Sequence, residues 1–239
     1  MSISSEHADP EPATAIIFGA SGGIGAALLA NLHSRKQFAN LAGLSRGSQP
    51  PIDLLDESSI RSAAAHLAAH AAPLRLLIDA TGMLADGDSR PERSWRELDA
   101  AHLARAFAIN AVGPALLMKH FLPLLPRQGR SVFVSLSARV GSIADNNLGG
   151  WYSYRASKAA LNQLVHTAAI ELKRQSPQAV CVALHPGTVD TKLSAPFRTS
   201  HLEVRTPESA AELILQAIDG LSAADTGGFF DYRGLAIPW

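Results

Sequence analysis

The chain has 239 residues, of which 47% are hydrophobic and 18% charged, so it can bury a sizeable core and is not expected to be disordered. Its 21 lysines and arginines balance its 21 aspartates and glutamates, which argues against nucleic acid or an anionic membrane as the main partner. The single cysteine, Cys181, excludes an internal disulfide and a cysteine-based zinc cluster. Because Cys181 lies in an apolar run, we interpret it as a small buried side chain.

Short apolar runs alternate with longer helix-like segments along the chain. The apolar runs are Ala13–Phe18, Leu41–Leu44, Leu74–Asp79, Ser131–Leu136 and Ala179–Leu184, and the helix-like segments are Ile24–His33, Ser58–Ala71, Ser94–Leu125 and Tyr154–Arg174. This alternation predicts one α/β domain, residues 13–239, with a parallel sheet covered by helices on both faces.

The polar first residues, 1–12, are interpreted as a flexible tail without the pattern of a signal peptide. No apolar stretch approaches the roughly 20 residues that a bilayer-spanning helix needs. We therefore expect a cytoplasmic protein.

A glycine cluster separates the first apolar run from the first helix-like segment. Gly19, Gly23 and Gly25 are spaced as Gly-x-x-x-Gly-x-Gly. A turn without side chains lets a phosphate approach the backbone, and the N–H groups at the start of a helix attract its charge. The cluster therefore predicts a pyrophosphate site of a dinucleotide.

The same turn also fits a nucleophile elbow. Residues 19–23 match Gly-x-Ser-x-Gly, which would make Ser21 an acyl-transfer nucleophile with a later acid and a later histidine. That alternative explains neither Gly25 nor the tyrosine–lysine pair described below, so the nucleotide interpretation is preferred.

The end of the second apolar run indicates which nucleotide would bind. An acidic residue that binds a ribose 2′-hydroxyl is expected there, but the chain carries Ser45 and Arg46. A guanidinium can bind a 2′-phosphate, so NADP(H) is preferred over NAD(H); the alternative is that Arg46 is a solvated loop charge. Asp53, which precedes Leu54, lies where a third strand would end, and it could bind the adenine amino group or cap the next helix.

Of two neighbouring tyrosines, only Tyr154 has a lysine, Lys158, four residues later and hence on the same helix face. A free phenol titrates at about pH 10, and a nearby ammonium lowers its pKa. Tyr154 could then exchange a proton with a carbonyl or hydroxyl oxygen near neutral pH. The spacing alone also fits an ordinary helix face, but together with the glycine cluster it favours a catalytic pair.

Together, these motifs resemble the short-chain dehydrogenase/reductase family over nearly the whole chain. Gly19, Gly23 and Gly25 match the glycine motif of the family, and Tyr154 and Lys158 match its catalytic pair. The resemblance implies a single Rossmann-type doubly wound domain with a largely parallel sheet of about seven strands. It also implies a helical interface that would make the protein a homodimer or a homotetramer.

The resemblance assigns further residues to the site. Asn110 matches the helix asparagine that organises a water relay to the lysine, and Asp79–Gly82 stands where the family has Asn-Asn-Ala-Gly. Ala138 occupies the usual position of the catalytic serine, so that role is assigned to Ser137, with Ser135 as the less favoured alternative. Residues 186–191 resemble the Pro-Gly segment that meets the nicotinamide. The implied cofactor contacts are Gly19, Ser21, Gly23, Ile24, Gly25, Ser45, Arg46, Asp53, Leu54, Ala80, Thr81, Gly82, Asn110, Tyr154, Lys158, Pro186, Gly187, Val189 and Thr191.

The implied reaction is NADP(H)-dependent hydride transfer between nicotinamide and a small carbonyl or alcohol substrate. Tyr154 would give the proton to the carbonyl oxygen, and Ser137 would donate a hydrogen bond to that oxygen. Lys158 would lower the pKa of Tyr154 and bind the nicotinamide ribose, while Asn110 would support proton return from water. Residues 192–205 would form the substrate lid.

Within the family, the segments 142–155 and 227–232 are most similar to the C-factor and sniffer-type carbonyl reductase branch. The alternative function is a nucleotide-binding regulatory or signalling protein of the C-factor type with incidental turnover. The altered Asp79–Gly82 motif and the shifted serine motivate that alternative. A serine hydrolase using Ser21 is the less favoured third alternative.

The histidines predict no metal site. His66 and His70 are four residues apart on a helix-like segment, but the sequence places no third ligand beside them. His185 precedes the Pro-Gly segment and is interpreted as a packing residue at a strand end, and the aromatic segment Gly227–Trp239 is expected to pack on the domain.

Overall fold

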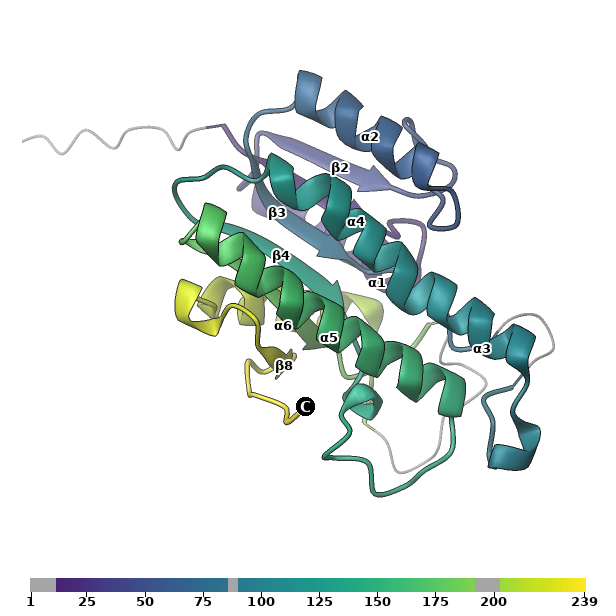
Figure 1. Ribbon diagram of the computed structural model, residues 1–239. Helices are drawn as coiled ribbons and strands as arrows, with labels where there is room; N and C mark the ends of the chain where they lie inside the picture. The colour runs from purple at the N-terminus through teal and green to yellow at the C-terminus, as the bar shows by residue number, and fades with distance from the viewer. Residues whose placement is uncertain (1–11, 86–89, 192–202) are drawn as a thin grey trace, which may run out of the picture.

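The computed structural model describes residues 12–85, 90–191 and 203–239, in which a central sheet is covered by helices on both faces (Figure 1). The proposed flexible tail, apart from residue 12, lies outside the described residues. The same is true of the proposed lid, apart from residues 203–205.

The sheet has six parallel strands in the order β2-β1-β3-β4-β5-β8. These strands are β1 (Thr14–Phe18), β2 (Asn40–Leu44), β3 (Leu74–Asp79), β4 (Ser131–Leu136), β5 (Ala179–His185) and β8 (Phe229–Asp231). A separate two-stranded sheet pairs β6 (Thr188–Val189) with β7 (Val204–Arg205). The predicted α/β class and parallel, doubly wound sheet are confirmed.

The sheet of the described residues has six strands, whereas about seven were expected from the family resemblance. The expected third strand, around Ile52, is not paired in the sheet; the N–H of Ile52 instead donates to the carbonyl of Ser45 at 2.9 Å. Pro50 and Pro51 directly precede it. Since proline has no N–H, the pair removes donors that a strand ladder would need.

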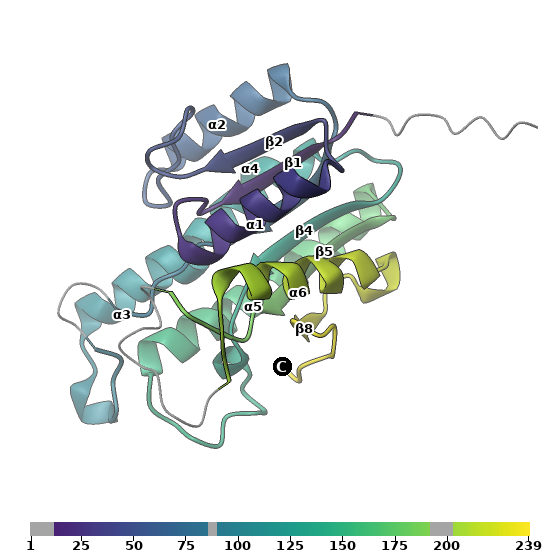
Figure 2. The same cartoon turned by 180° about the vertical axis from the view of Figure 1, so that it is seen from behind.

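Two sets of helices cover the sheet. Figure 1 shows α2 (Glu57–His70), α4 (Gly113–Phe121) and α5 (Tyr152–Gln175) on one face, and Figure 2 shows α1 (Gly23–Arg35) and α6 (Pro207–Gly220) on the other. Short 3-10 turns follow or precede these helices at Trp95–Glu97, Leu122–Leu124, Arg139–Gly141 and Ala223–Asp225. Helix α6 was not among the predicted elements, although Thr206 caps it through the N–H of Ser209 at 3.2 Å and Pro207 occupies its first turn.

The predicted helix Ser94–Leu125 is interrupted in the structure. Its middle consists of α3 (Ala100–Phe107), a π-helical turn (Ala108–Val112) and α4. The run Ala100–Leu124 has 25 residues and is long and apolar enough to cross a membrane, which corrects the expectation that no stretch approaches that length. Its buried side chains, among them Leu117, Met118 and Phe121, pack into the core, and 44% of its most apolar 18-residue window is buried.

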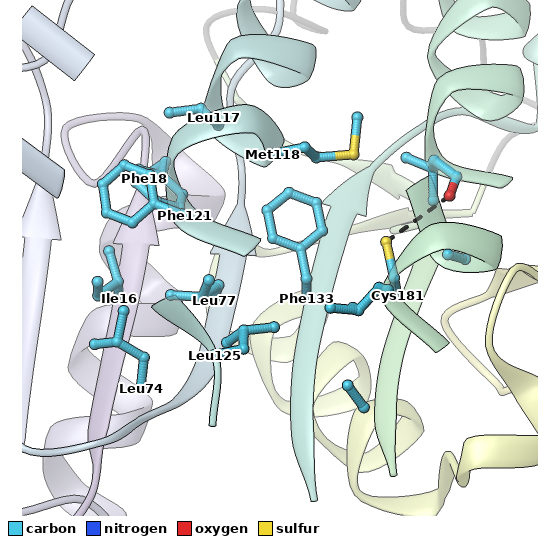
Figure 3. Packing of buried hydrophobic residues seen from close by; sticks show 14 of the residues in the cluster. Ile16, Phe18, Leu74, Leu77, Leu117, Met118, Phe121, Leu125, Phe133 and Cys181 are labelled. Atoms are coloured by element: carbon cyan, nitrogen blue, oxygen red, sulfur yellow. Dashed lines mark hydrogen bonds between the residues drawn. The ribbon is translucent and has the colours of Figure 1, made fainter. Parts of the chain in front are cut away.

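The central strands β1, β3, β4 and β5 are buried on both faces, so each contributes alternate side chains to two cores, whereas the edge strand β2 is mostly only partly buried. Ile16 and Phe18 face the α4 side, and the ring of Phe18 meets the ring of Phe121 edge-on at 4.7 Å (Figure 3). Cys181 lies in the same core, where burial raises the pKa of its thiol to about 12. The interpretation of Cys181 as a buried packing residue is confirmed.

We expect Phe121→Ala to lower the free energy of unfolding by about 3–5 kcal/mol, because it empties a fully buried ring position between α4 and β1. Urea unfolding at equilibrium measures this loss. Leu148→Ala, at a position that is 91% exposed, is the control and should change the unfolding free energy by less than about 0.5 kcal/mol. An equal effect of the two variants would contradict this account of the core.

Candidate active site

The carboxyl ends of the parallel strands lie side by side along one edge of the sheet. The N–H of Gly19 donates to the carbonyl of Leu44, the last residue of β2, at 2.9 Å. The N–H of Ala80 donates to the carbonyl of Phe18, the last residue of β1, at 3.0 Å. The chain therefore leaves β1, β2 and β3 at the same level. The strand order reverses direction between β1 and β3, which is where open parallel sheets form ligand crevices.

The glycine turn is shaped by close backbone approaches. Gly19 has a φ of +77°, and its carbonyl accepts the N–H of Gly22 at 2.9 Å. A Cβ at Gly25 would clash with the Gly19 carbonyl, and a Cβ at Gly23 would lie 2.9 Å from Cγ2 of Thr191. The turn therefore needs residues without side chains, and it brings Thr191 beside the start of α1, where Gly22 provides no side-chain cap.

The segment after β2 presents Arg46 on the exposed surface. Asp53 does not cap α2, because Asp56 accepts the N–H of Ser58 at 2.9 Å in that role. The carboxylate of Asp53 instead accepts the N–H of Leu55 at 3.0 Å within the preceding turn. The helix-capping alternative for Asp53 is therefore corrected.

Leu54, predicted to contact the cofactor, packs against α4. A Cβ at Gly113 would lie only 2.7 Å from Cβ of Leu54. The glycine thus allows α4 to approach the segment that follows β2.

Asp79 is a buried carboxyl at the end of β3. It accepts the Ser135 hydroxyl at 2.6 Å, the Thr81 N–H at 3.0 Å and the Thr81 hydroxyl at 2.5 Å. Burial raises its pKa, although these hydrogen bonds and the charge of Lys158 act in the opposite direction. Through these three hydrogen bonds, Asp79 holds the end of β3 to β4 and to the following turn.

Asn110 lies in the π-helical turn and is fully buried. Its amide oxygen accepts the N–H of Met83 at 2.7 Å, and its amide nitrogen donates to the Met83 carbonyl at 2.7 Å and the Ser157 hydroxyl at 3.0 Å. A Cβ at Gly82 would lie 3.6 Å from both Oδ1 of Asn110 and Nζ of Lys158. The structure therefore brings Asn110, Gly82 and Lys158 together, as the sequence predicted for one site.

Tyr154 and Lys158 lie in the first two turns of α5, with Nζ of Lys158 6.0 Å from the centroid of the Tyr154 ring. Lys158 is 2% exposed and donates to the carbonyl of Leu136 at 2.9 Å. Burial lowers its pKa to about 8, and the charge of Asp79 partly opposes that shift. Since one of three ammonium hydrogens is used by Leu136, the others can reach a further acceptor.

The phenol of Tyr154 differs from the sequence-based expectation. Burial raises its pKa to about 12, whereas the neighbouring ammonium was expected to lower it. The cause is the desolvation of the phenolate, which disfavours the charged form. Tyr154 is therefore protonated at neutral pH, which is the state needed to donate a proton.

Ser137 directly follows β4, and its N–H donates to Leu184 at 2.8 Å. Its hydroxyl donates to the amide oxygen of Asn162 on α5 at 2.6 Å. The Asn162 amide nitrogen faces the Gly141 carbonyl at 3.5 Å, which fixes the orientation of the amide. Sequence reasoning missed Asn162, which orients the Ser137 hydroxyl, while the neighbouring Ala138 has no hydroxyl to offer.

His185 ends β5, just before the Pro186–Gly187 segment. Its Nδ1 is buried and lacks a hydrogen-bond partner among the described residues. Burial lowers its pKa to about 4, helped by the charges of Arg139 and Arg205 and opposed by Asp231. Its neutral, packed state agrees with the interpretation of His185 as a packing residue.

The last predicted cofactor segment turns sharply after His185. Gly187 has a φ of +81°, and a Cβ there would lie 3.0 Å from the ring of Tyr232. Val189 is buried in β6.

His66 and His70 stack on each other on the exposed surface of α2, with ring centroids 4.6 Å apart. Across the described ranges, no group of three or more histidine, cysteine, aspartate or glutamate residues is arranged to hold a metal ion.

Comparison with known proteins places these features in a family. A family model described as "Enoyl-(Acyl carrier protein) reductase" matches residues 13–213. A 1-hydroxy-2-glutathionyl-2-methyl-3-butene dehydrogenase of Rhodococcus sp. (strain AD45) is 30% identical over 239 residues, covering 95% of this chain and 99% of the relative. The C-signal protein of Myxococcus xanthus is 39% identical over 143 residues, covering 60% of this chain and 82% of the relative.

Two solved structures show the same fold. An NADPH-bound carbonyl reductase from chicken fatty liver superposes with a TM-score of 0.83 at 23% identity, covering 98% of this chain and 97% of that one. The carbonyl reductase Sniffer of D. melanogaster gives a TM-score of 0.81 at 24% identity, with coverages of 96% and 99%.

We expect acid to destabilise the protein through His185. Between its ordinary pKa of 6.5 and its folded value of about 4, the unfolded chain binds a proton that the folded protein does not. The free energy of unfolding should therefore fall by roughly 3 kcal/mol as the pH drops through this window. Urea unfolding at pH 7 and pH 4.5 should show a smaller loss for His185→Gln than for the wild type, and equal losses would contradict the assignment.

Proposed function

Since the chain belongs to the short-chain dehydrogenase/reductase family, we propose that it catalyses NADP(H)-dependent reduction of a small carbonyl compound or oxidation of the corresponding alcohol. The observation that carries the proposal is the convergence of the buried Lys158, the protonated Tyr154 and Asn110 at the crevice edge of the sheet. When bound, a nicotinamide supplies or accepts the hydride.

The residues at the crevice fit a dinucleotide. Gly19, Gly23 and Gly25 keep side chains away from the close backbone approach at the uncapped start of α1, where a pyrophosphate could approach N–H groups. Arg46 lies two residues after the end of β2 and is exposed, and it would bind the 2′-phosphate of NADP(H). Lys158 would donate its remaining ammonium hydrogens to ribose hydroxyls.

Tyr154 is the proton donor of the proposed reduction. Its raised pKa keeps the phenol protonated while the substrate is bound, and the charge that develops on the substrate oxygen then draws the proton. Ser137 would donate a hydrogen bond to the same oxygen, which requires that its hydroxyl turn from Asn162. The protonated ammonium of Lys158 would stabilise the phenolate left behind.

A second candidate function is a nucleotide-binding signalling role. The similarity to the C-signal protein supports it, as do the carboxyl of Asp79 and the engaged hydroxyl of Ser137. It predicts NADPH binding without turnover over a panel of aldehydes and ketones. The third alternative, a serine hydrolase with Ser21 as nucleophile, is not favoured, because the chain belongs to an oxidoreductase family.

The remaining expectations stay proposals. The substrate is a small molecule, and the proposed location is the cytoplasm. We propose a homodimer or a homotetramer on the family resemblance; Val112 and Ile170 are about half exposed on the helices that would form its interface.

We expect Tyr154→Phe to reduce kcat/KM for carbonyl reduction by about 10²- to 10⁴-fold, because the variant lacks the proton donor. NADPH oxidation followed by absorbance measures the rate, and quenching of protein fluorescence measures the Kd for NADPH, which should be unchanged. Tyr152→Phe is the matched control and should retain full activity. Residual activity of Tyr154→Phe near the wild-type level would refute the assignment.

We expect Arg46→Ala to raise the KM for NADPH by about 10- to 100-fold, because one charge-assisted contact with the 2′-phosphate is lost. The KM for NADH should be unchanged, since that cofactor has no 2′-phosphate. Arg61→Ala is the control, because Arg61 is also exposed but lies on α2. It should leave both KM values unchanged. A parallel change for NADPH and NADH would show that Arg46 does not read the phosphate.

A further inference from the structure

The helix that carries Tyr154 begins without a cap of its own. Its N-cap residue, Trp151, has a φ of +54° and makes no side-chain capping bond. Gly149 and Gly150 before it have φ values of +64° and +65°. Trp151 alone among the three carries a Cβ in this left-handed region, so neighbouring structure must hold this start of α5 in place.

Glu92 supplies the missing cap from a distant segment. Its carboxylate accepts the N–H of Ser153 at 3.2 Å and also the Ser153 hydroxyl, and its backbone carbonyl accepts the N–H of Trp151 at 2.5 Å. Glu92 is 3% exposed and Ser153 is 0% exposed. Two of the N–H groups that a helix start leaves free are thus satisfied by one residue 59 or more positions earlier in the chain.

The charge of Glu92 suits this position. Burial raises the pKa of its carboxyl, but the hydrogen bonds from Ser153 outweigh burial, and the nearby His102 adds to the lowering, so the net pKa lies below its ordinary value. A carboxylate at a helix start also interacts favourably with the helix dipole. On the other side of the turn, Arg155 donates to the Gly150 carbonyl at 2.9 Å.

We propose that Glu92 is a positioning residue for Tyr154: its carboxylate caps α5 from outside the helix and fixes the turn from which the phenol projects. The proposal rests on the proposed function only where it concerns turnover. Lys158, one turn later, is anchored separately to Leu136. Loss of Glu92 would therefore loosen the proton donor while the ammonium and the cofactor contacts stay in place.

Steady-state kinetics test this division. Glu92→Ala should lower kcat by about tenfold, the equivalent of one lost helix cap, while the KM for NADPH stays within about twofold. Glu92→Gln should restore most of kcat, because its amide oxygen can accept the Ser153 N–H and its amide nitrogen can donate to the Ser153 hydroxyl. Equal losses in Glu92→Gln and Glu92→Ala would overturn the capping geometry.

Asp56 offers a matched control. Its carboxylate also accepts both the N–H and the hydroxyl of a serine, Ser58, at 2.9 and 2.6 Å, but it caps α2, which carries none of the proposed catalytic residues. Asp56→Ala should reduce stability while leaving kcat unchanged. A similar fall of kcat in both alanine variants would mean that Glu92 acts through general stability, and the proposal would be wrong.

Amide hydrogen exchange tests the cap without any turnover. In Glu92→Ala, the amides of Trp151 and Ser153 should exchange at least about tenfold faster than in the wild type, while the amide of Leu161 in the middle of α5 stays protected. Unchanged exchange at Trp151 and Ser153 would overturn the proposal. If the wild type itself reduced no carbonyl substrate, the proposed function would fail, and this measurement would still decide the role of Glu92.

Glu92→Asp covers the case in which the alanine variant does not fold. The aspartate keeps the charge but shortens the side chain by one methylene, so it should give the same exchange pattern as the alanine variant with a smaller effect. The proposal requires that the shorter aspartate side chain no longer reach Ser153 fully. If Glu92→Asp protected the amides of Trp151 and Ser153 as well as the wild type does and left kcat unchanged, the proposed cap would be wrong.

Discussion

The ammonium group of Lys158 is held inside the protein by a carbonyl at the end of a strand, and the candidate site is arranged around that contact. Burying an ammonium is costly unless it is hydrogen-bonded and faces an opposite charge. The Leu136 carbonyl provides the bond, and the buried carboxyl of Asp79 provides attraction. This contact joins α5 to β4 and so holds that helix against the sheet at Lys158.

The polar residues around this contact are connected to protein partners rather than left free. Asn110 is bonded to Met83 and Ser157, and Ser137 is bonded to Asn162. Buried polar groups require such partners, and a fully bonded network holds one arrangement of the backbone. The network therefore fixes the crevice edge, and a bound substrate has to compete with Asn162 for the Ser137 hydroxyl.

The opposite pKa shifts of Tyr154 and Lys158 have one cause, which is burial. Burial disfavours the phenolate and the ammonium alike, so it raises the pKa of Tyr154 to about 12 and lowers that of Lys158 to about 8. A phenol that stays protonated suits proton donation in a reduction. In the oxidation direction Tyr154 has to act as a phenolate, and the same burial opposes its formation. The positive charge of Lys158 would then be the main factor that stabilises the phenolate.

The sequence by itself determined what depends on neighbouring residues. Apolar runs located five of the six strands of the described sheet, and the glycine turn and the Tyr154–Lys158 spacing located the candidate site, because strand burial, tight turns and i, i+4 pairs are local properties. Tertiary structure decided what depends on burial or on distant partners: the raised pKa of Tyr154, the bond of Ser137 to Asn162 and the cap that Glu92 provides. No local pattern marks these features, since desolvation and long-range hydrogen bonds exist only once the helices are packed on the sheet.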